Sequence, residues 1–87
     1  MMNPNISYQG FNTMQAILFD QFYEETLPPE LRAECYLALR RIFHTRVDHL
    51  DRAVTFVKGR LAEQQLTGQQ VIQLFDDFLH TARQNEH

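Results

Sequence analysis

The chain has 87 residues, one cysteine and a formal net charge of −3 at pH 7. This length corresponds to a single domain, which buries only about 60–65% of the surface of its unfolded chain, so self-association is a ready source of further stability. The lone cysteine excludes an internal disulfide, and the acidic balance argues against bulk nucleic-acid binding, which needs clustered positive charge.

The N-terminal sequence shows no targeting signal. Residues 1–10 contain neither a basic segment nor an apolar segment of signal-peptide type, and no run approaches the length of a transmembrane helix. Together with the unpaired cysteine, this predicts a reducing, cytoplasmic setting. We expect Cys35 to be a small buried side chain rather than a reactive thiol, because it falls among apolar residues at helical spacing.

Residues 1–11 are expected to form a flexible arm, since Pro4 and Gly10 interrupt helices. Such an arm either frays, as termini do unless they are tied down, or wraps around a partner subunit. The sequence leaves both interpretations open.

A first helix is predicted over residues 12–26. Asn12 and Gln15 have the spacing of a capping box, with Asn in place of Ser or Thr. The apolar residues that follow form a wide stripe: Met14, Ile17, Leu18, Phe19, Phe22 and Tyr23. A stripe of this width favours contact with two neighbouring helices or with a partner chain.

A long second helix is predicted over residues 29–65. Pro28 ends the first helix, and Pro29 suits the first position of the next one. No proline follows, so we favour one continuous helix of about 55 Å, which is too long for the other helices to cover in a compact monomer. The alternative is a bend near His44 and Thr45, because Thr45 and Asp48 have the spacing of a helix cap.

An apolar stripe runs through the second half of this helix. We call it the central stripe, and it comprises Phe43, Val47, Leu50, Val54, Val57 and Leu61. The spacing alternates between three and four residues, and Arg46 and Asp51 flank the stripe at positions that can pair between parallel chains. Two interpretations stay open: the core face of a helix in a small bundle, and a dimer interface like that of a coiled coil.

The clearest local signal marks the start of a last helix over residues 68–83, which is followed by a frayed tail over 84–87. Thr67 and Gln70 have the spacing of a capping box, and Leu66 and Val71 have that of a hydrophobic staple.

No catalytic, cofactor-binding or metal-binding site is predicted. His44 with Asp48, and Asp76 with His80, are pairs four residues apart, but helical geometry places both pairs away from the apolar stripes. The other carboxylates also lie on outer faces, and the three glycines form no phosphate-binding loop. The chain is therefore predicted to be non-enzymatic, with no cofactor and no small-molecule substrate.

The main alternative is a helix-turn-helix DNA-binding transcription regulator with Gly68 in its turn. Gln69 and Gln70 would then begin the recognition helix, where Gln can read adenine. Against this, Asp76 and Asp77 would repel phosphates. The acidic outer faces also argue against binding to a membrane surface, so neither nucleic acid nor membrane is the expected partner.

We therefore predict an all-α domain of three or four helices, built as a helical bundle around a long central helix. We expect it to form a homodimer or, as a monomer, to offer the central stripe to another protein. The predicted function is that of a small protein–protein interaction module: a regulator, adaptor or inhibitor that binds a larger protein, as accessory proteins of bacteria, phages and plasmids do. Arginine and aromatic residues, which are enriched at interfaces, are abundant here. The candidate contact residues are Phe19, Tyr23, Arg46, Val47, Leu50, Asp51, Val54 and Val57.

Overall fold

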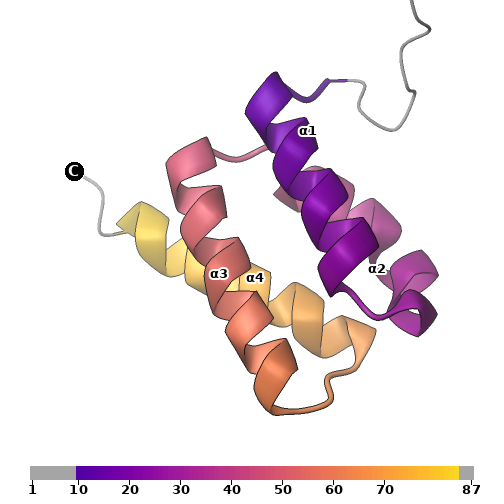
Figure 1. Cartoon of the computed structure of the whole chain (residues 1–87). Coiled ribbons are helices and arrows are strands. Elements are labelled where there is room, and N and C mark those ends of the chain that lie inside the picture. The colour runs from indigo at the N-terminus through magenta and orange to yellow at the C-terminus, as the bar shows by residue number, and fades with distance from the viewer. Residues whose placement is uncertain (1–9, 85–87) are drawn as a thin grey trace, which may run out of the picture.

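The computed structural model describes residues 10–84, and all regular structure among them is helical (Figure 1). The all-α prediction is thus confirmed. The elements, in chain order, are α1 (Thr13–Asp20), the π-helical segment η2 (Gln21–Thr26), α2 (Pro29–Ile42), α3 (Val47–Glu63) and α4 (Gly68–Gln84).

The predicted arm over 1–11 and tail over 84–87 lie outside the described residues except at their inner ends. Phe11 is half-buried, with its ring centroid 5.5 Å from that of Phe19 and 4.5 Å from that of His44. The chain is therefore attached to the core just before α1.

The continuous helix favoured over residues 29–65 is not formed. The chain leaves α2 at Phe43 and enters α3 at Val47, as the alternative of a bend expects. In the bend, the carbonyl of Thr45 accepts a hydrogen bond of 2.8 Å from Gln15 Nε2, and the Phe43 ring is buried. These tertiary contacts outweigh the local preference for continuing the helix.

The structure has α4 as its connecting helix instead of a long central one. α4 packs against both α2 and α3, and α1 packs against α3 (Figure 1). The Cα atoms extend over 39 × 37 × 17 Å. Packed helix axes lie about 8–10 Å apart and the Cα cylinder has a radius of about 2.3 Å, so the smallest dimension corresponds to two layers of helices. Each helix consequently keeps one face outside the core.

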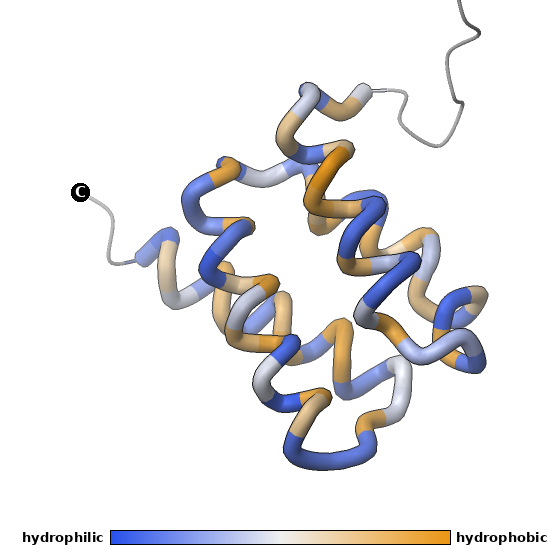
Figure 2. The backbone as a smooth tube through the Cα atoms, viewed as in Figure 1, coloured by the Kyte–Doolittle hydropathy of each residue, from blue (hydrophilic) through white to orange (hydrophobic). Residues whose placement is uncertain are grey.

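Apolar residues recur along every helix (Figure 2), and an aromatic cluster lies at the centre of the core. Phe22, Phe43 and Phe75 are fully buried, and the Phe43 ring lies 6.2 Å from Phe22 and 5.6 Å from Phe75. Phe19 adds a fourth ring, 5.4 Å from Phe43. These separations are those of favourable aromatic pairs. The cluster joins α1, η2, the bend and α4.

The first helical stretch ends in a π-helical segment. The N–H of Leu27 donates a hydrogen bond of 2.8 Å to the carbonyl of Phe22, five residues earlier. Such π turns are rare, and they shift the helix face that follows them. Phe22 is buried, whereas Met14 and Ile17 are 47% and 42% exposed. The wide apolar stripe predicted here is therefore only partly covered by the chain itself.

The start of α4 has the capping box that the spacing predicts, and Thr67→Ala is expected to destabilise the protein by about 1 kcal/mol. The Thr67 hydroxyl accepts a hydrogen bond of 3.1 Å from the Gln70 N–H, and the Gln70 side chain accepts one of 2.9 Å from the Thr67 N–H. Urea denaturation measures the loss. Thr55→Ala is the control, because this exposed hydroxyl only donates back to the carbonyl of Asp51. Equal losses in the two variants would contradict a stabilising cap.

Candidate protein-interaction groove

Most of the predicted contact residues are covered by the chain's own helices. Leu50 and Val57 are fully buried, and Phe19 and Val54 keep only 3% and 8% exposure. Val47 is half-buried against the same core. From Val47 onward the central stripe is thus the core face of α3, which is the first of its two interpretations, and Phe43 lies in the bend before that helix. Because the residues of the stripe are buried in the chain's own core, they do not form the exposed contact surface that their spacing was predicted to provide.

Tyr23 holds η2 against α2. Its ring stacks on Phe19 with the centroids 5.3 Å apart, and its hydroxyl donates a hydrogen bond of 3.1 Å to the carbonyl of Arg32. Burial, followed by the nearby Tyr36, raises the pKa of Tyr23. These contacts give Tyr23 a role in packing η2 against α2.

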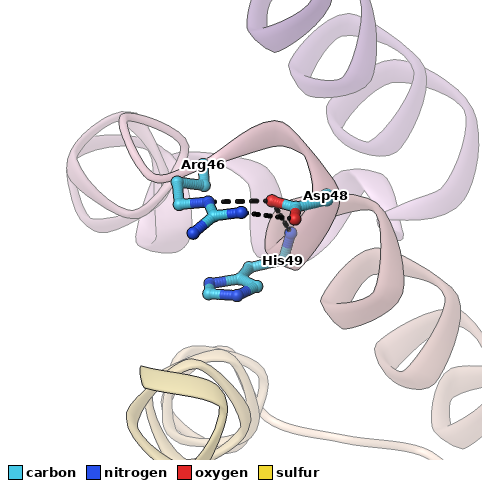
Figure 3. A network of polar contacts seen from close by, with 3 residues as sticks. All are labelled: Arg46, Asp48 and His49. Carbon is cyan, nitrogen blue, oxygen red and sulfur yellow. Dashed lines mark hydrogen bonds and ion pairs between the residues drawn. The ribbon is translucent and has the colours of Figure 1, made fainter. Parts of the chain in front are cut away.

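Arg46 and Asp51 are exposed, and Arg46 pairs with Asp48 on its own chain (Figure 3). Asp48 accepts hydrogen bonds of 2.8 and 3.2 Å from the Arg46 guanidinium and one of 2.9 Å from the His49 backbone N–H. The bond from Arg46 is the main reason that the pKa of Asp48 is lowered. Asp48 therefore stabilises the N-terminus of α3, where a negative charge is favoured.

A groove of about 750 Å³ lies between α3 and α4, and the sequence does not predict it. We call it the α3–α4 groove, and its lining includes His49, Arg52, Phe56, Leu74, Asp77 and Phe78. Binding sites commonly have volumes of about 300–1,000 Å³ and combine apolar and aromatic walls with a few polar groups. The groove has this composition.

The floor of the groove is a stacked aromatic pair, of which Phe56 is exposed and Phe78 is partly buried. The rings of Phe56 and Phe78 stack with their centroids 5.3 Å apart and an interplanar angle of 29°. Phe56 is 39% exposed, and the Arg60 guanidinium lies 5.8 Å from the centroid of its ring. Contacts on two sides hold this ring in one orientation while it remains open to solvent. A preordered, exposed aromatic side chain is well suited to the centre of an interface.

One end of the groove contains a polar atom that is buried without a partner. His49 is only 5% exposed, and its Nδ1 has no hydrogen-bond partner among the described residues. Leaving such an atom unpaired costs about 1–3 kcal/mol. Arg52, one turn further along α3, and Asp77 on α4 line the same groove. The groove thus combines an aromatic floor with an imidazole, a cation and an anion.

Neither a metal cluster nor a reactive thiol is present in the described part of the chain. Within residues 10–84, no three side chains of His, Cys, Asp or Glu lie close enough together to hold a metal ion. Cys35 is buried and its thiol donates a hydrogen bond of 3.6 Å to the carbonyl of Gly68. Burial is the largest cause that raises the pKa of Cys35. A thiol in this state has little thiolate character, so Cys35 acts as a small core side chain.

The geometry of α4 suits DNA poorly. Gln70, one of the two glutamines considered as base readers, uses its side chain to cap the N–H of Thr67. Asp76 and Asp77 are exposed on the same helix, and Asp77 accepts a hydrogen bond of 2.9 Å from Gln73. These carboxylates would repel the phosphate backbone. The two carboxylates on α4 therefore weigh against the DNA-binding alternative.

Further comparisons add no functional assignment. Among the helices of residues 10–84, none is both long enough and apolar enough to cross a lipid bilayer. Comparisons of the chain with models of protein families, with curated proteins and with solved structures found no match.

Proposed function

We propose that the protein is a small non-enzymatic interaction module that contacts another protein chain through the α3–α4 groove. The observation that carries this proposal is the stacked pair at the floor of the groove, in which Phe56 is 39% exposed and Phe78 is partly buried. Aromatic residues and arginine are enriched at protein interfaces, and hot spots lie where such anchors are surrounded by groups that exclude water.

Two rows of side chains border the groove at a spacing that suits a helix. Residues four apart share one helix face. Arg52 and Phe56 line the groove from α3, and their row continues to Arg60; Leu74, Phe78 and Ala82 form the row on α4. A third helix can lay its apolar face between two rows of this kind. A homodimer and a complex with a larger protein would both fill the groove. By occupying a surface of its partner, the protein would act as a regulator, an adaptor or an inhibitor.

A photoreactive side chain tests this proposal. Benzoylphenylalanine replaces Phe56 in one version of the chain and Lys58 in another, and cells that naturally produce the protein are irradiated. Lys58 is exposed on the same helix but does not line the groove, so it controls for random collision. We expect one predominant protein adduct from position 56 and little from position 58.

A second substitution makes the result specific to the groove. Phe78→Asp, added to the version with the photoreactive group at position 56, is expected to remove the adduct because it places a charge in the apolar floor. Equal and diffuse labelling from positions 56 and 58 would contradict the proposal.

A further inference from the structure

We infer that the chain which fills the α3–α4 groove is a second copy of this protein, related to the first by a two-fold axis. This inference rests on the proposed function, because it takes the groove to be the contact surface. The groove has Arg52 on α3 and Asp77 on α4, together with the aromatic pair. In a two-fold pair the same patch meets itself, so Arg52 of each copy can face Asp77 of the other.

Both charges are free to make this contact. Arg52 is exposed and makes no ion pair or hydrogen bond with the rest of residues 10–84. Asp77 is also exposed, and it accepts a hydrogen bond from Gln73 through Oδ1 only, which leaves Oδ2 open. A partner segment of one charge sign would set a like charge against either Arg52 or Asp77. A second copy matches both charges at once.

Association of the purified full chain tests the inference. Sedimentation velocity over a dilution series, at low and at high salt, gives the dissociation constant of the pair. We expect a concentration-dependent dimer that Arg52→Asp and Asp77→Arg each weaken by about tenfold or more, because each reversal sets like charges against each other. The double variant exchanges the two signs and is expected to recover an affinity near that of the unmodified chain. Lys58→Asp makes the same charge change outside the groove and should leave the affinity unchanged.

Each alternative outcome overturns a defined part of the inference. An unmodified chain that stays monomeric at every concentration excludes self-pairing. Single reversals that weaken the dimer no more than Lys58→Asp does, or a double variant that fails to recover, exclude pairing between Arg52 and Asp77. Circular dichroism verifies that every variant keeps its helices, which is expected because all three side chains are exposed.

The photochemical experiment separates this inference from the proposed function. An adduct with twice the mass of the chain supports self-pairing through the groove. An adduct with a different protein, from a chain that is monomeric in sedimentation, retains the groove as a contact surface and overturns self-pairing. The absence of any specific adduct overturns both.

Discussion

Leu50→Asp is expected to unfold the protein rather than to separate folded copies. Leu50 is fully buried on the core face of α3. The substitution removes about 1.5–3 kcal/mol of apolar burial. It also places a carboxyl group where no partner is available, which costs several kcal/mol more whether the group ionises or takes up a proton. The sum is comparable with the whole free energy of unfolding of a small domain, about 5–15 kcal/mol.

Helicity and solution mass, followed together, distinguish unfolding from dissociation. We expect Leu50→Asp to lose helical circular dichroism at all protein concentrations. Phe56→Asp is the control, because it puts the same charge on the same helix at a side chain that is 39% exposed, and it should remain helical. A Leu50→Asp chain that stays helical and only becomes monomeric would place Leu50 at a subunit interface and contradict the core described above.

Apolar spacing predicts which face of a helix is buried but not what covers it. Leu50 and Val57 are buried, as their spacing predicts, yet the same spacing is shared by the core face of a bundle helix and by a dimer interface. The capping signals are more informative. Asn12 with Gln15, and Thr67 with Gln70, exchange the predicted hydrogen bonds because a capping box depends only on neighbours in sequence.

The bend and the π-helical segment depend on contacts between distant parts of the chain, so local patterns indicate the bend only as an alternative and the π-helical segment not at all. Gln15 binds the carbonyl of Thr45 across a separation of 30 residues. Phe43 is held by rings from α1, η2 and α4. Without these contacts, residues 29–65 carry no signal strong enough to stop a helix, and their sequence alone favours a continuous one.

The α3–α4 groove has a similar origin. Its floor requires Phe56 and Phe78 to lie side by side, which depends on how α3 and α4 pack against each other. One local signal is nevertheless present in the sequence: Phe56 stands four residues from Arg52 and four from Arg60, outside the central stripe. An aromatic residue between two arginines on the polar side of a helix indicates a surface that is used for contact, and this row could have been recognised without the structure.

Phe43→Ala is expected to lower the free energy of unfolding by about 3–5 kcal/mol. The Phe43 ring is fully buried and lies 5.4 Å from Phe19, 6.2 Å from Phe22 and 5.6 Å from Phe75. These neighbours belong to three different elements, so they cannot all move to fill the cavity that the smaller side chain leaves. Urea denaturation measures the loss. Phe56→Ala removes the same atoms from an exposed position and should cost only about 1 kcal/mol.

Comparing the two variants at two protein concentrations separates core from interface. A residue within the chain's own core changes stability equally at both concentrations, whereas a residue between subunits has an effect that depends on concentration. We therefore expect a constant loss for Phe43→Ala and, if the groove pairs two copies, a concentration-dependent loss for Phe56→Ala. The reverse pattern would place the central stripe between subunits and leave the groove without a partner, because Phe43 belongs to that stripe and Phe56 to the groove.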